Sequence, residues 1–196
     1  MPIASRLGFW FITPTPTPPP PPEPPVNPTP IENIIADYVL AQYIFPYGLD
    51  LDTRTKMTIP AVPGDYVGWA RGVTQSNIVT WGGDNTGSGV ESVLIDVDAY
   101  RAAYPGTDTF NVDFNCFWYA SGYGQSVFLT MTMYTGGTMI KSGFTWTNPT
   151  ATSSVQLTTT TKPIYEVSTS PGTNGAPLGY MSYNVVTGNG SLDIIG

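Results

Sequence analysis

Strict alternation of apolar side chains over residues 110–118 is the feature that most restricts how this chain can fold. The alternating apolar positions are Phe110, Val112, Phe114, Cys116 and Trp118. Because successive side chains of a strand point to opposite faces, this period of two predicts a strand with one buried face. Residues 126–134 repeat the pattern and predict a second strand of the same kind.

Short β-branched and aromatic runs between turn residues predict further strands. They cover residues 52–60, 66–70, 77–81, 91–97, 139–146, 155–161, 164–169 and 180–186. Only 11% of the residues are charged, so the Glu and Lys that helices carry on their solvent faces are scarce. Residues 31–43 alone have helix-like spacing, and they fit a helix or a strand. Many short strands at this spacing predict an all-β fold, a β-sandwich or jelly-roll-like body over residues 31–196.

A proline-rich segment separates this body from a short hydrophobic tip. Residues 13–30 alternate proline with threonine and contain an unbroken proline run from Pro18 to Pro22. This composition favours polyproline II, at about 3.1 Å per residue, so the segment predicts a semi-rigid stalk on the order of 50 Å long.

The tip, residues 1–12, carries apolar side chains that would promote association if left in water. We therefore expect it to dock into another subunit as an anchor while the stalk holds the body away. Two alternatives are that the tip folds back onto its own body and that the stalk is a ligand of an SH3-like module. The candidate anchoring residues are Ile3, Leu7, Phe9, Trp10, Phe11 and Ile12.

Charge and hydropathy argue against several classes of partner. The net charge is −7 and the seven cations are scattered, so the chain lacks the basic groove that nucleic acid needs and the basic cluster that favours a membrane surface. No run approaches the roughly 20 apolar residues of a transmembrane helix. The apolar start lacks a small-residue cleavage site, so we expect no signal peptide. The single cysteine, Cys116, excludes an intrachain disulfide, and its apolar strand predicts a buried, inert thiol.

The chain contains no histidine, which removes the commonest general base and the Ser-His-Asp and Cys-His arrangements. The glycines of residues 82–89 lack the lysine and helix of a phosphate-binding loop. We expect no enzyme. The remaining alternative is a polysaccharide hydrolase, which needs two carboxyl groups about 5–9.5 Å apart. Its candidates would be Asp50, Asp52, Asp84, Glu91, Asp96 and Asp98.

Two oxygen-rich segments predict a calcium site. Residues 81–91 form a glycine-rich loop that carries Asp84 and ends in Glu91, and upstream Asp50 and Asp52 project to one side of an extended segment. Calcium takes six to eight oxygen ligands, which such a loop can supply. The alternative is a hairpin in which Asp84 and Asn85 make only turn hydrogen bonds.

These motifs resemble a known family. Gly48-Leu49-Asp50-Leu51-Asp52, and Gly83-Asp84-Asn85-Thr86-Gly87 with Glu91 after it, resemble the core of the TerD-type calcium-binding β-sandwich of tellurium-resistance proteins, over about residues 48–119. The resemblance implies that Asp50, Asp52, Asp84 and Glu91 contribute to cation sites, and it implies a role in stress response. The loop between Gly87 and Glu91 is shorter than in the family and lacks the usual run of acidic residues.

The layout as a whole resembles virion appendage proteins of tailed bacteriophages, such as head fibres, capsid decoration proteins and tail adhesins. The features are the start Met-Pro-Ile-Ala-Ser-Arg-Leu-Gly-Phe-Trp, a low-complexity stalk and a β body rich in Thr, Ser, Gly and Tyr. The resemblance implies a structural protein on the virion surface, bound through its N-terminus to other virion proteins and frequently trimeric. This is the leading interpretation, and the calcium module is the runner-up.

A tail adhesin would also bind a host-surface glycan, because exposed aromatic rings stack on sugars. The candidate rings are Trp69, Tyr100, Tyr104, Tyr119, Tyr123 and Trp146. We expect most of them to lie in the core or on a sheet face.

Overall fold

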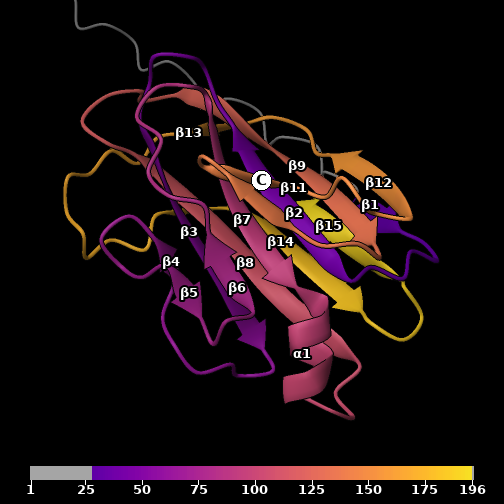
Figure 1. Cartoon of the computed structure of the whole chain (residues 1–196). Helices are drawn as coiled ribbons and strands as arrows, with labels where there is room; N and C mark the ends of the chain where they lie inside the picture. The colour runs from indigo at the N-terminus through magenta and orange to yellow at the C-terminus, as the bar shows by residue number, and fades with distance from the viewer. Residues whose placement is uncertain (1–27, 196) are drawn as a thin grey trace, which may run out of the picture.

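The computed structural model of the chain describes residues 28–195, which form two antiparallel β-sheets packed face to face (Figure 1). The first sheet has six strands. In spatial order they are β1 (Thr29–Ile31), β15 (Gly190–Ile194), β14 (Ala176–Asn184), β8 (Thr109–Trp118), β3 (Leu51–Ile59) and β4 (Val67–Gly68).

The second sheet faces the first and has seven strands. Its main path runs β12 (Ser153–Thr158), β9 (Gln125–Thr135), β2 (Tyr38–Ile44), β7 (Val90–Asp96), β6 (Val79–Trp81) and β5 (Thr74–Gln75). Strand β13 (Lys162–Ile164) pairs with β9 beside β12. A separate hairpin of β10 (Ile140–Ser142) and β11 (Thr145–Thr147) contacts β7. The predicted all-β sandwich is thereby confirmed.

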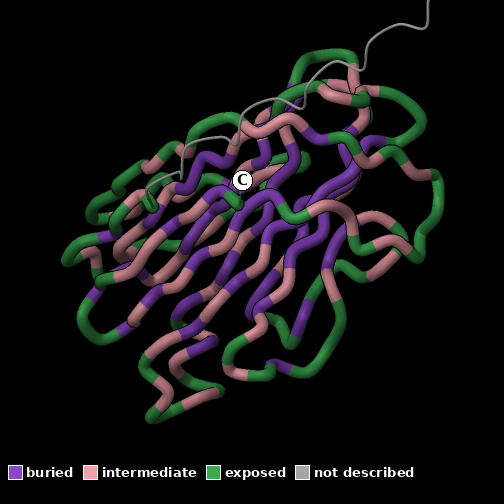
Figure 2. Tube along the Cα trace, turned by 180° about the vertical axis from the view of Figure 1, so that it is seen from behind, coloured by how far each residue is buried: buried purple, intermediate pink, exposed green. Residues whose placement is uncertain are grey.

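The core lies between the sheets and is built from the alternating positions that the sequence identifies. All five apolar positions of the 110–118 run are fully buried, and so is the thiol of Cys116, as predicted. Figure 2 shows buried residues along the strands and exposed ones mainly in the connecting loops. The facing run on β9 buries Val127, Leu129 and Met131 in the same way.

Several strands differ from the sequence-based expectation. The segment with helix-like spacing contains β2, whose pairing with both β7 and β9 fixes it as an inner strand. Residues 139–146 form a hairpin with a turn at Gly143, where one strand was expected. Residues 164–169 lie almost wholly outside regular strands, because β13 ends at Ile164. Strands β1, β5 and β15 were not predicted.

The helix α1 (Val97–Ala103) follows β7 directly and was also not predicted (Figure 1). The Asp96 side chain accepts a hydrogen bond from the backbone N–H of Ala99 at 2.8 Å and so caps the helix. Val97 and Tyr100 bury one side of the helix against the sandwich. None of the helices in the described part of the chain is long and apolar enough to cross a membrane.

The folded body begins at the edge of the first sheet. Among the described strands, β1 pairs with β15 alone, and it starts at Thr29, within the segment predicted as stalk. Residues 1–27, which include the predicted anchor and most of the stalk, lie outside the described residues. The described part of the body thus includes residues 28–30, which were predicted as stalk.

Candidate metal centre

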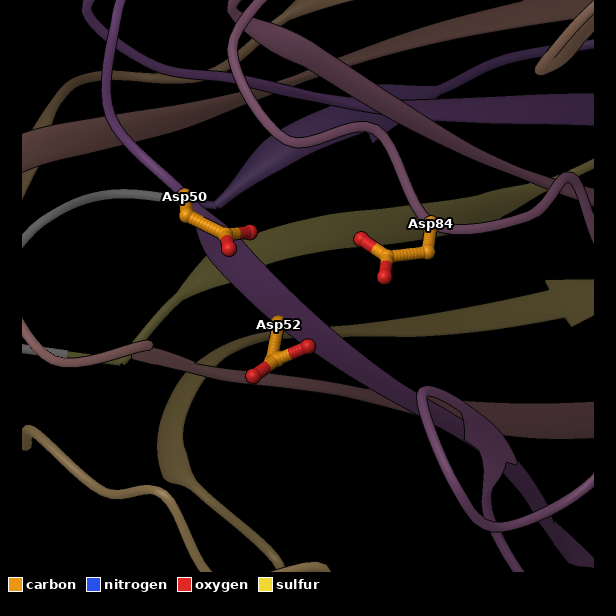
Figure 3. Close-up of side chains that lie close together, drawn as sticks. All are labelled: Asp50, Asp52 and Asp84. Atoms are coloured by element: carbon orange, nitrogen blue, oxygen red, sulfur yellow. The ribbon is translucent and has the colours of Figure 1, made fainter.

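Three aspartates from two separate segments converge at one edge of the sandwich (Figure 3). Asp50 and Asp52 stand at the beginning of β3 in the first sheet, and Asp84 lies in the loop between β6 and β7 of the second sheet. One carboxylate oxygen from each residue lies within 4.8 Å of the other two. The predicted grouping of these three side chains is present in the structure.

Strand geometry explains why Asp50 and Asp52 act together. Leu51, between them, is fully buried in the core, so its two neighbours point to the opposite, outer face of β3. The segment before β3 is tied to the β6–β7 loop, because the backbone N–H of Gly48 donates to the carbonyl oxygen of Gly87 at 3.0 Å. This bond holds the two aspartate-bearing segments side by side.

The β6–β7 loop is fixed by its own polar contacts. The side-chain amide of Asn85 donates to the carbonyl oxygen of Val90 at 2.7 Å and also to the hydroxyl of Ser88. Gly89 has a φ of +82°, and a β-carbon there would lie 2.7 Å from the carbonyl oxygen of Phe45, so only glycine fits. Asp84 is therefore presented by an ordered loop.

The three carboxylates are poorly satisfied within the described part of the chain. Asp52 is 98% buried, since its relative exposure is 2%. Buried oxygens without a hydrogen-bond partner occur on all three residues, namely Asp50 Oδ1, Asp52 Oδ2 and Asp84 Oδ1. An unpaired buried carboxylate oxygen is costly, so three carboxylates that lie together and each carry such an oxygen indicate a missing positive partner.

The pKa values of the three aspartates are all raised, which agrees with the lack of a positive partner for their carboxylates. Burial raises the pKa of Asp52 to about 7, and the neighbouring charge of Asp50 adds to the increase, while Arg54 opposes it. Burial also raises the pKa of Asp50, with a further contribution from Asp84, and burial alone raises that of Asp84. Such shifts arise where desolvation and like charges coincide, which is common at functional sites.

Glu91, the fourth candidate ligand, has a different role. Its carboxylate lies inside the sandwich and accepts hydrogen bonds from Thr53 Oγ1 at 2.6 Å, from Trp81 Nε1 at 3.2 Å and from the backbone N–H of Asn85 at 3.2 Å. Both of its oxygens are thus engaged, and it is absent from the aspartate cluster. Burial raises the pKa of Glu91 to about 8 against these three donors. Through these three hydrogen bonds, Glu91 connects β3, β6 and the β6–β7 loop inside the sandwich.

The aspartate cluster has the size and chemistry of a calcium site. Two oxygens on a common calcium ion, each 2.3–2.6 Å from it, stand at most about 5 Å apart, which the observed 4.8 Å satisfies. Carboxylate oxygens are the ligands that hard cations prefer. A cation held there would join β3 of one sheet to the β6–β7 loop of the other.

The remaining carboxylate candidates lie elsewhere. Asp96 caps α1, and Asp98 forms an ion pair with Arg101 at 2.8 Å. These two residues are at the end of β7 that leads into α1, and the aspartate cluster is beside the loop that precedes β7.

Arg54 is a residue near the site that the sequence did not identify. Its guanidinium is fully buried, lies 4.9 Å from the ring centre of Phe117, and donates to the carbonyl oxygens of Thr53 and Thr173. It lies two residues after Asp52 on the same face of β3. The only sequence signal for its place near the site was the alternation of charged residues along this strand.

The aromatic candidates divide by burial. Tyr100 and Trp146 are buried, Trp69 and Tyr104 are partly buried, and Tyr119 and Tyr123 are exposed. Four of the six rings are thus at least partly buried, in agreement with the expectation that most of them lie in the core or on a sheet face.

Comparison of the chain with protein-family models, with curated proteins and with solved structures gave no match in any of the three. The site is therefore interpreted from its own geometry.

Proposed function

We propose that the body is a calcium-binding β-sandwich with a structural or binding role, in which the cation fastens the two sheets at one edge. The observation that carries this proposal is the convergence of three carboxylates that each have a buried oxygen without a hydrogen-bond partner, one of them on the almost completely buried Asp52. A cation neutralises this cluster, and its removal leaves like charges facing one another.

The same geometry disfavours a carboxylate-based hydrolase. Retaining glycosidases hold their two carboxyl groups about 5–5.5 Å apart, and inverting enzymes hold them about 6.5–9.5 Å apart to leave room for a water. Here the three oxygens lie within 4.8 Å of one another, which suits an ion better than a scissile bond.

The test is thermal unfolding of the full chain with calcium and with EDTA. At a calcium concentration about 100 times the dissociation constant, binding adds about 2.7 kcal/mol, which raises Tm by roughly 5–10 °C in a chain of this size. Asp84→Asn should abolish the increase. It should also leave the EDTA value unchanged or slightly higher, because it removes one repelling charge.

The matched control is Asp108→Asn, which removes an exposed carboxylate outside the cluster and should keep the full calcium response. An unchanged Tm on addition of calcium to the parent chain, or an equal response in Asp84→Asn, would refute the proposed site.

A second proposal concerns where the module works, and it rests on the proline-rich segment. We propose that residues 1–27 attach the body to other proteins of a virion, as a capsid decoration protein or head fibre. The first described strand, β1, is an edge strand, so a stalk would leave the body at its rim. The experiment is incorporation of the full chain and of a chain starting at Pro28 into particles. Equal incorporation of both chains would reject an N-terminal anchor.

A further inference from the structure

An aromatic platform stands beside the aspartate cluster on the outer face of the first sheet. The backbone N–H of Tyr119 donates to the carbonyl oxygen of Asp50 at 3.0 Å, which continues the β3–β8 pairing by one residue beyond Leu51 and Trp118. Trp118 and Leu51 point into the core, so Tyr119 and Asp50 both point outward. Opposed side chains of this kind have β-carbons about 4.5–5.5 Å apart.

A second ring extends this platform. Trp69, in the segment after β4, packs edge to face against Tyr119, with ring centres 5.6 Å apart. Tyr119 retains 38% of its exposure despite this contact. A rigid, partly exposed ring therefore lies next to Asp50, with its orientation fixed by a neighbour.

The three carboxylates alone do not fill the coordination of calcium. Three carboxylates supply between three and six oxygens, and calcium takes six to eight. Asp50 and Asp84 are partly exposed, whereas Asp52 forms the buried floor of the cluster. Asp50, one of the two partly exposed residues, is also the cross-strand neighbour of Tyr119.

We propose that this edge binds a neutral sugar residue of a glycan, with two adjacent hydroxyls completing the coordination of calcium and the sugar ring lying against Tyr119. This inference rests on the proposed calcium site. The negative face of an aromatic ring attracts the polarised C–H groups of a sugar, and the metal and carboxylates fix the hydroxyls.

Charge favours a neutral ligand over an anionic one. The three carboxylates carry three negative charges against two positive charges on calcium, and the buried guanidinium of Arg54 beyond Asp52 balances the remainder. The loaded site therefore has no excess positive charge with which to attract a phosphate or a carboxylate. The hydroxyl oxygens of a neutral sugar supply further ligands to calcium without adding charge to the site.

The experiment is saturation-transfer NMR of the full chain with methyl α-mannopyranoside and methyl β-galactopyranoside, with calcium and with EDTA. These two probes present adjacent hydroxyls in different stereochemistry. We expect transfer to at least one glycoside in calcium and its loss in EDTA and in Asp84→Asn. Tyr119→Ala should weaken binding roughly fivefold or more while the calcium-dependent rise in Tm persists.

The matched control is Tyr180→Ala. Tyr180 lies on the outer face of the same sheet opposite Asp113, six positions along β8 from Tyr119, or about 20 Å away, and it should bind sugar like the parent. A chain that binds calcium but transfers saturation to neither glycoside, or does so equally in EDTA, overturns this inference alone. A chain that does not bind calcium overturns the calcium site and this inference together.

Discussion

Asp52 combines almost complete burial with an unpartnered oxygen and a nearby like charge. A carboxylate in that position is stable only if it is protonated or if it meets a cation. The sequence placed Asp50, Asp52 and Asp84 in one site because oxygen-bearing residues in glycine-rich or extended segments are typical of calcium loops. Glu91 carried the same signal, but its donor Thr53 lies 38 residues away on the facing sheet, and sequence spacing does not reveal such a contact.

The first residue-scale prediction concerns pH. Without a cation, the folded chain holds the pKa of Asp52 at about 7 and that of Glu91 at about 8, whereas carboxyl groups of an unfolded chain ionise near pH 4. Between these values the folded chain binds protons that the unfolded chain has released, so its stability falls as pH rises. We expect Tm in EDTA to drop by several degrees between about pH 5 and pH 8, measured by circular dichroism.

Calcium should change this slope, because it binds the ionised form of Asp52. The gap in Tm between calcium and EDTA should widen as pH rises through about 7. Glu91 lies outside the cluster, so its own contribution to the slope should remain in both conditions. Parallel profiles in calcium and EDTA would mean that no cation reaches Asp52.

The second residue-scale prediction separates Glu91 from the metal ligands. Glu91→Gln replaces one accepting oxygen by an amide that faces a donor, at a site where three donors converge. We expect the free energy of unfolding to fall by about 1–3 kcal/mol in a denaturant titration at about pH 5, where the raised pKa of Glu91 costs least stability. The calcium-induced rise in Tm should persist. Its loss in Glu91→Gln, with the fold intact, would instead make Glu91 a ligand.

At the scale of elements, local pattern identified strands well where they are long and paired on both sides. Strands β8 and β9 were predicted almost residue for residue, because burial on one face imposes the period of two. Strands β1, β5 and β15 have two to five residues, which is too short for a periodic signal. The helix α1 was hidden because Val97 continues the alternation of Val93 and Ile95, and only the Asp96 cap marks the change of structure.

This cap gives the element-scale prediction. Asp96→Ala removes the hydrogen bond to the backbone N–H of Ala99 and should lower the free energy of unfolding by about 1 kcal/mol. Asp98→Ala removes only a partly exposed ion pair with Arg101 and should cost no more than about 0.5 kcal/mol. Chemical denaturation of the two variants checks the order. A larger loss in Asp98→Ala would show that the Arg101 contacts, and not the cap, hold α1.

At the scale of the molecule, the body depends on contacts between segments that are distant in sequence. Strand β1 at the start pairs with β15 at the end, and β3 contacts β6 and β7 of the opposite sheet beside the aspartate cluster. A cation at the cluster fastens one edge of the sandwich, and the β1–β15 pairing closes the far edge of the first sheet. Composition predicted the sandwich, but the pairing of its two ends depends on the whole chain being folded.

The whole-molecule prediction compares two truncated chains. A chain starting at Pro28 keeps every described strand, including β1, and should unfold at the Tm of the full chain. A chain starting at Glu32 loses the pairing of β1 with β15 and the burial of Ile31, which is 1% exposed. Losing that side chain alone should cost about 1.5–3 kcal/mol and lower Tm by roughly 3–10 °C.

Both chains should retain the calcium response, since the aspartate cluster lies at the opposite edge of the first sheet. Equal Tm values for the two chains would show that β1 does not stabilise the body, and residues 28–31 would then belong to the stalk.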